Sequence, residues 1–69
     1  MAMLKINGSD RQFPTGLPQN LTELLDQLGI NQATVAAEID GRIIERRNFA
    51  QTQLIDGQAV ELVRFVGGG

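Results

Sequence analysis

Gly67, Gly68 and Gly69 are the residues with the clearest chemical potential, because they bring a carboxylate to the end of a run of bare backbone. Glycine has no Cβ and adopts backbone angles closed to other residues, so such a run is slender and can extend. Three extended residues reach about 10 Å. A disordered chain terminus without a chemical role can have the same glycine-rich composition, so the tail alone leaves both interpretations open. We expect a folded domain over residues 1–66 and a flexible tail over residues 67–69, with Gly69 as the reactive site and Gly67 and Gly68 giving access to it.

Few other side chains in the chain could do chemistry. It has no cysteine and no histidine, which excludes thiolate nucleophiles, iron–sulfur ligation and the usual general base near neutral pH. The carboxylates, the arginines and Lys5 show no spacing typical of paired acid–base groups or of metal ligands. A small enzyme is therefore the least favoured class, and no bound metal or cofactor is expected.

The composition also limits which classes of partner and which cellular compartment are expected. Six basic and eight acidic residues give a net charge of −2, too small a field to attract nucleic acid or an anionic membrane. No apolar run approaches the roughly 20 residues that span a bilayer, and no segment has the pattern of a secretory signal. Together with the lack of cysteine, these features lead us to expect a cytoplasmic protein of one domain, held by packing alone.

Apolar periodicity predicts strands separated by tight turns. The predicted strands are 4–6, 35–39 and the longest and most apolar, 59–66, together with a polar strand at 11–13, anchored by Phe13, and a short returning strand at 42–45. Asn7-Gly8 and Asp40-Gly41 suit the positive φ angles of two-residue hairpin turns, and Asp56-Gly57 predicts a further turn. Phe49 and Leu54 are expected to plug the edge of the sheet from an irregular segment.

One amphipathic helix is predicted between the second and third strands. Asn20 can accept hydrogen bonds from the first turn, Glu23 can complete a capping box, and Gly29 ends the helix. The apolar stripe of this helix consists of Leu21, Leu24, Leu25 and Leu28. So short a helix needs a sheet to pack on. We therefore expect an α+β fold, a mixed sheet of about four to five strands with the helix across one face, joining parallel strands that lie side by side.

The last predicted strand has two different faces. If Val60 and Leu62 point toward the helix, Val63 and Phe65 point the other way, where nothing is expected to cover them. They form either a docking site for a partner, beside the glycine run, or a contact within the domain. Arg64 is expected to swing out to solvent or to a carboxylate of the partner.

A basic cluster precedes this strand and consists of Arg42, Arg46 and Arg47. Such a cluster is either a solvated edge of the sheet or a contact for an acidic partner surface. The residues alone leave both interpretations open.

The order of these elements resembles the ubiquitin-like β-grasp sulfur carriers, and among them the thiamine-biosynthesis (ThiS) family. The matching stretches are Lys5-Ile6-Asn7-Gly8, Leu21-Thr22-Glu23-Leu24-Leu25, Asp40-Gly41 with Ile43-Ile44 and Arg46, Leu54-Ile55-Asp56-Gly57 and the run from Val60 to Gly69. The resemblance implies a carrier that is a co-substrate and not an enzyme. In that family an adenylating (ThiF-like) enzyme uses ATP and Mg to activate the terminal carboxylate, here that of Gly69. A sulfur donor protein then displaces AMP and leaves a thiocarboxylate, which a ThiG-like thiazole synthase uses to build the thiazole ring of thiamine.

Two other interpretations of the same pattern stay open. The small subunit of molybdopterin synthase uses the same tail chemistry, but it is usually longer and its central pattern is less similar. A β-grasp interaction module that is never activated would use Val63 and Phe65 only for binding, and it would have no need of a bare Gly-Gly end.

Overall fold

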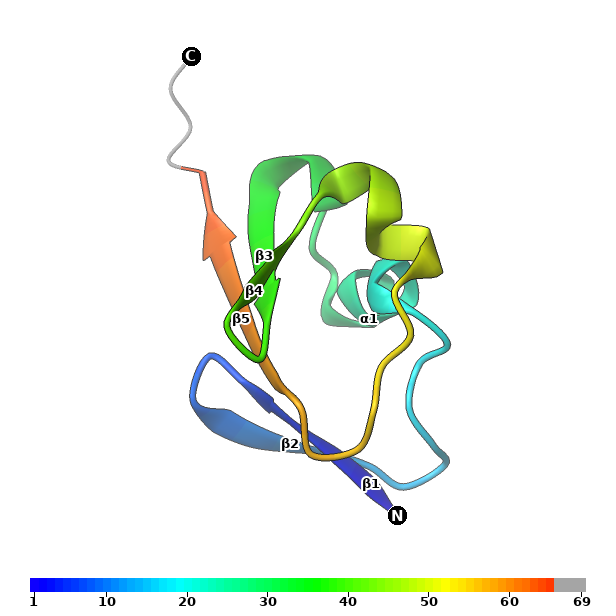
Figure 1. Ribbon diagram of the computed structural model, residues 1–69. Coiled ribbons are helices and arrows are strands. Elements are labelled where there is room, and N and C mark those ends of the chain that lie inside the picture. Colours follow the sequence, from blue (N-terminus) through cyan, green and yellow to red (C-terminus); the bar gives the residue numbers. More distant parts are fainter. Residues whose placement is uncertain (66–69) are drawn as a thin grey trace.

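The protein is built on a mixed five-stranded sheet (Figure 1). The computed structural model describes residues 1–65 of the chain. The strands lie in the order β2-β1-β5-β3-β4. The bounds of the strands, of the α-helix and of the two 3-10 helices (η) are Ala2–Ile6 (β1), Ser9–Phe13 (β2), Leu21–Leu28 (α1), Gln32–Thr34 (η1), Val35–Ile39 (β3), Arg42–Ile44 (β4), Arg46–Gln51 (η2) and Ala59–Arg64 (β5). The predicted α+β class, a mixed sheet with one α-helix across it, is confirmed.

The connection made by the helix differs from the prediction. The helix α1 follows β2 and leads to β3, and these two strands are separated in the sheet by β1 and β5. The parallel neighbours are instead β1 and β5, with Lys5 opposite Ala59 and Ile6 opposite Val60. The expectation that the helix joins adjacent parallel strands was wrong, because the apolar last strand takes the central position, where its backbone pairs on both sides.

Local sequence signals set the ends of α1 as predicted. The side chain of Asn20, which caps the helix, accepts a hydrogen bond from the N–H of Glu23 at 2.9 Å. The Glu23 carboxylate in turn accepts a hydrogen bond from the N–H of Gln19 at 3.3 Å. The helix ends at Gly29, whose φ of 71° is left-handed. The hairpin turns at Asn7-Gly8 and Asp40-Gly41 also form, with positive φ at each residue. No helix in residues 1–65 is long and apolar enough to cross a membrane.

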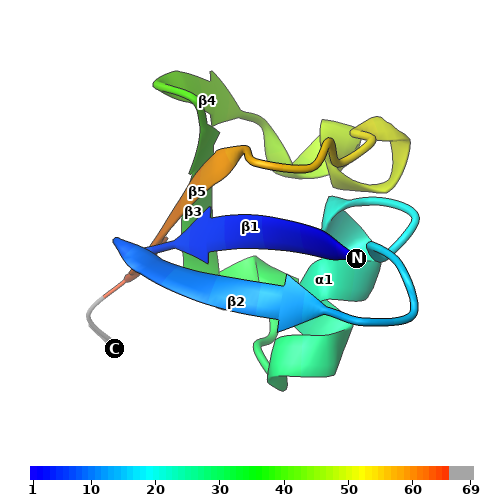
Figure 2. The same cartoon turned by 90° about the horizontal axis from the view of Figure 1, so that it is seen from below.

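The core lies between α1 and η2 and one face of the sheet, called here the covered face. Both α1 and η2 lie on this same side of the sheet (Figure 1 and Figure 2). The buried side chains of the core are Leu4, Phe13, Leu21, Leu24, Leu25, Val35, Ala37, Ile39, Phe49, Val60 and Leu62. Phe49 is 1% exposed and Leu54 packs against the core, as expected. The expectation of an irregular segment was wrong at Phe49, because residues 46–51 wind into a 3-10 helix, an element too short to leave a clear apolar period.

Candidate functional site

The strand β5 leads toward the predicted reactive end of the chain. Gly67, Gly68 and Gly69 themselves lie outside the described residues. β5 is central in the sheet and ends at the opposite end of the molecule from the N-terminus (Figure 1). Beyond the strand, the N–H of Phe65 still donates to the carbonyl of Thr34 at 2.8 Å. The chain is therefore hydrogen-bonded to its neighbours up to Phe65.

The side chains of β5 alternate between the two faces as predicted. Val60 and Leu62 are 0% and 9% exposed in the core, whereas Val63 and Phe65 are 60% and 55% exposed. Arg64 is exposed, in agreement with the expectation that it swings outward. The structure thus brings the exposed Val63 and Phe65 to the end of β5 that precedes the glycine run.

The other face of the sheet, called here the open face, carries Ala36, Glu38, Ile43, Glu61 and Val63 on the three neighbouring strands β5, β3 and β4. The register places Ala36 opposite Val63 and Glu38 opposite both Glu61 and Ile43. α1 and η2 lie on the far side of the sheet (Figure 2). Ile43 is 78% exposed, so the open face presents apolar side chains around two carboxylates.

Glu38 and Glu61 form an unusual pair on the open face, because like charges directly opposite each other destabilise an antiparallel pair. Within residues 1–65 no basic side-chain nitrogen lies within 4.0 Å of either carboxylate, since the ion pairs there join Lys5 to Asp10 and Arg47 to Glu45. The same part of the chain holds no group of acidic side chains placed to bind a metal ion. The two charges are thus left to solvent or to a partner.

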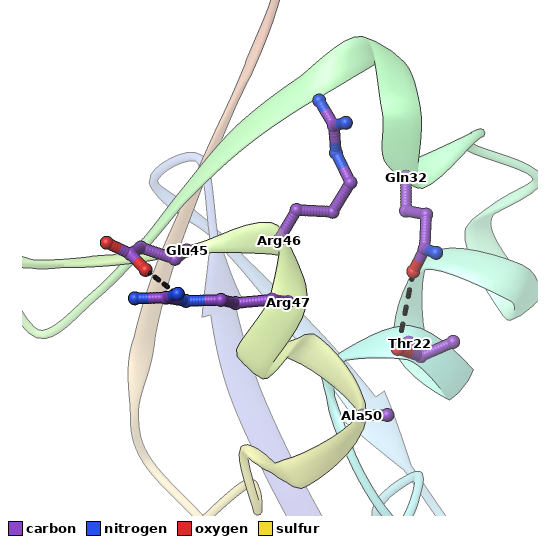
Figure 3. Close-up of a pocket in the computed structure, with 6 residues that line it drawn as sticks. All are labelled: Thr22, Gln32, Glu45, Arg46, Arg47 and Ala50. Carbon is purple, nitrogen blue, oxygen red and sulfur yellow. Dashed lines mark hydrogen bonds and ion pairs between the residues drawn. The ribbon is translucent and has the colours of Figure 1, made fainter.

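The basic cluster behaves differently from the open face. A shallow groove between α1 and η2 is lined by Thr22, Gln32, Glu45, Arg46, Arg47 and Ala50 (Figure 3). Arg47 Nε pairs with Glu45 at 2.7 Å, and Arg46 donates to the carbonyl of Ala33 at 3.3 Å. Figure 3 shows the two guanidinium groups pointing in different directions. Arg46 and Arg47 are exposed and do not converge on one point, and Arg42, the third arginine of the cluster, is exposed at the start of β4. This arrangement favours the solvated edge over a binding site.

Comparison with known proteins provides evidence that is independent of this geometry. The model of the ThiS family matches residues 4–69. This chain belongs to the ThiS family. A crystal structure of the thiamine biosynthesis protein ThiS from Geobacter metallireducens resembles it with a TM-score of 0.82 at 40% identity, covering 97% of this chain and 99% of the other. The predicted ubiquitin-like β-grasp fold is confirmed.

Two sequence relatives of this ThiS-family chain differ in length. The sulfur carrier protein ThiS of Bacillus subtilis (strain 168) is 33% identical over 69 residues, covering 97% of this chain and 100% of the relative. A thiazole synthase of Paramagnetospirillum magneticum is 36% identical over 66 residues, covering 96% of this chain and 20% of the relative. The chain therefore spans about a fifth of the thiazole synthase and the whole of the carrier.

Sequence reasoning missed two features of this ThiS-family surface. Ile43 faces out while Ile44 faces the core, and the alternation of side chains along the predicted strand 42–45 could have indicated this. The opposition of Glu38 and Glu61 had no such signal, because it depends on the register between two strands far apart in the sequence.

Proposed function

We propose that this chain is a sulfur carrier of thiamine biosynthesis whose Gly69 carboxylate is adenylated and then converted to a thiocarboxylate. The observation that carries the proposal is the similarity of this chain to a protein named as a sulfur carrier, which covers 97% of this chain and 100% of that protein. The exposure of Val63 and Phe65, just before the glycine run, supports it further. Gly67 and Gly68 serve as the slender access to the partner's site.

The chemistry of the proposal requires activation from outside the chain. A carboxylate is a poor electrophile, and the adenylating enzyme supplies a leaving group by transferring AMP from ATP, with Mg, to the carboxylate oxygen and releasing pyrophosphate. In the sulfur transfer, the outer sulfur of a persulfide on the donor protein attacks the acyl carbon and AMP leaves, giving an acyl disulfide. A thiol reductant then cleaves the S–S bond to the donor, and sulfur stays on the carbonyl of Gly69 as a thiocarboxylate. The carrier is a co-substrate in both steps, so ATP and Mg belong to the partner enzyme.

The partners in this proposal are an adenylating enzyme, a sulfur donor protein and a thiazole synthase. The thiazole synthase relative includes a stretch similar to this chain within one polypeptide, which supports joint action of carrier and synthase. Val63 and Phe65 are proposed as the apolar contacts on these partners, with Arg64 reaching a partner carboxylate beside them. The names of the relatives favour thiamine over molybdopterin as the product pathway.

Mass spectrometry tests the proposal. The chain is produced together with a ThiF-like adenylating enzyme and a sulfur source, and its intact mass is measured. We expect a shift equal to the exchange of one oxygen for sulfur, with fragmentation locating it on Gly69. A known ThiS protein treated in parallel is the control for active enzymes. An unshifted mass, when the control is converted, would overturn the carrier function.

A further inference from the structure

The Asn7 side chain reaches across to the backbone of β5. Its Nδ2 donates to the carbonyl of Leu62 at 3.2 Å, and its Oδ1 accepts from the N–H of Leu62 at 2.7 Å. The two residues are 55 positions apart in the sequence, and both hydrogen bonds are partly buried. One side-chain amide thus satisfies both backbone groups of a single residue, as a neighbouring strand would otherwise do.

This contact stands where the pairing between β1 and β5 runs out. The N–H of Lys5 donates to the carbonyl of Gln58, and the N–H of Asn7 donates to the carbonyl of Val60, each at 2.9 Å. The next residue of β5 that faces this edge is Leu62, but by then the chain has turned away into β2. The Asn7 side chain therefore replaces the missing step of the ladder.

Asp40 makes a similar contact near the other end of β5. Its N–H donates to the carbonyl of Ala59 at 2.8 Å, and its Oδ1 accepts from the N–H of Ala59 at 2.9 Å. Asn7 and Asp40 are both first residues of hairpin turns with a φ of 50°. The two turns thus hold β5 on opposite edges, Asp40 at the start of the strand and Asn7 near its end.

The residues that follow Leu62 are those proposed to meet the partner enzymes. On the β3 side, this segment is held as far as Phe65, whose N–H bonds to Thr34. On the β1 side, within residues 1–65, the last hydrogen bonds to β5 are the two between the Asn7 side chain and the backbone of Leu62. On the β1 edge, the Asn7 side chain is therefore the last hydrogen-bonding partner of β5 before Val63 and Phe65.

We propose that Asn7 is a positioning residue for sulfur transfer, acting through Leu62 on the direction in which β5 delivers Val63, Phe65 and the glycine run to the adenylating enzyme. This inference rests on the proposed function. The expected effect is on docking, because apolar contact residues that are displaced from the partner surface contribute less to binding and so lower kcat/KM. The proposed role does not require Asn7 to touch the partner enzyme. Asn7 instead fixes the part of β5 that leads to Val63 and Phe65.

Two matched glycine variants separate positioning from general stability. Asn7→Gly and Asp40→Gly both keep a positive φ at the first turn position, because glycine adopts it freely. Each removes one side chain that bonds to the backbone of β5, but only Asn7→Gly releases the end next to the docking residues. kcat/KM of the adenylating enzyme for each carrier is measured at a temperature where circular dichroism shows all the proteins folded.

For Asn7→Gly we expect kcat/KM to fall by about tenfold or more, with Asp40→Gly within about twofold of wild type. In the free protein, amide exchange at Leu62 should be about tenfold faster in Asn7→Gly and unchanged in Asp40→Gly. Equal losses of kcat/KM in both variants, or wild-type kcat/KM in Asn7→Gly, would overturn the positioning role. If wild-type chain itself is not adenylated by an enzyme that accepts a known carrier, the proposed function fails and this inference with it.

Asn7→Asp provides the comparison if Asn7→Gly does not fold. Aspartate keeps the Oδ1 acceptor for the N–H of Leu62 and tolerates a positive φ, but it has no donor for the Leu62 carbonyl. We expect a loss of kcat/KM of about threefold or more, because one of the two hydrogen bonds is gone. Wild-type kcat/KM in Asn7→Asp, together with faster exchange at Leu62, would show that the bridge does not position the site.

Discussion

Val60 and Leu62 are almost completely buried on the covered face of the sheet, whereas Glu61 and Val63, their neighbours along β5, are exposed on the open face. The strand geometry is the same for all four residues. Their difference comes from what lies opposite, since α1 and η2 pack on one face only (Figure 2). One face of so small a domain can thus supply its stability and leave the other available to partners.

The largest effect is expected from Phe49, which enters the covered face from η2 and is 1% exposed. Phe49→Ala should lower the free energy of unfolding by about 3–5 kcal/mol, because it leaves a cavity in the core. Ile43→Ala, on the open face, should change it by less than about 0.5 kcal/mol. Urea unfolding of both variants measures the difference. Similar losses in the two would show that the faces do not divide these roles.

A second prediction concerns Phe65 as a docking residue. Phe65→Asp should weaken binding to the adenylating enzyme by about tenfold or more, since it puts a charge in a proposed apolar contact. The Tm should be almost unchanged, because the side chain is 55% exposed. Ile55→Asp is the matched control, as Ile55 is 64% exposed and lies before β5. Calorimetric titration measures both, and equal affinities for the two variants would reject Phe65 as a contact.

The smallest effect is expected from the opposed carboxylates on the open face. Glu61→Gln should raise the free energy of unfolding by about 0.2–1 kcal/mol, because it removes the repulsion from Glu38. Glu38→Gln and the double variant complete a double-mutant cycle that isolates this interaction. The gain should shrink in high salt, which screens exposed charges. A coupling energy of zero at low salt would mean that the two carboxylates do not interact across the strands.

Much of the fold could be predicted because its signals are local. The turn at Asn7-Gly8, the capping pair of Asn20 and Glu23 and the alternation of Val60 to Phe65 each depend on residues close in the sequence. The resemblance to the ThiS family, which depends on the order of these signals along the chain, is confirmed by the comparisons.

The parts that could not be predicted depend on distant pairing. The position of β5 between β1 and β3 is set by which strands meet, and no spacing within a strand encodes that choice. The two hydrogen bonds of Asn7 to Leu62 cross 55 positions, so the same asparagine could be recognised only as a turn residue. The assignments of Gly67, Gly68 and Gly69 stay predictions, since these residues lie outside the described part of the chain.

The most direct test of the division between a stable body and a reactive end uses the chain without Gly69. Its Tm and its conversion to a thiocarboxylate are measured on the same preparation, beside wild type and Gly68→Val. We predict that both changes abolish conversion, because one draws the terminal carboxylate back by one residue, to Gly68, and the other obstructs its access, while each Tm stays close to that of wild type. Retained conversion, or a large fall in Tm, would contradict the account.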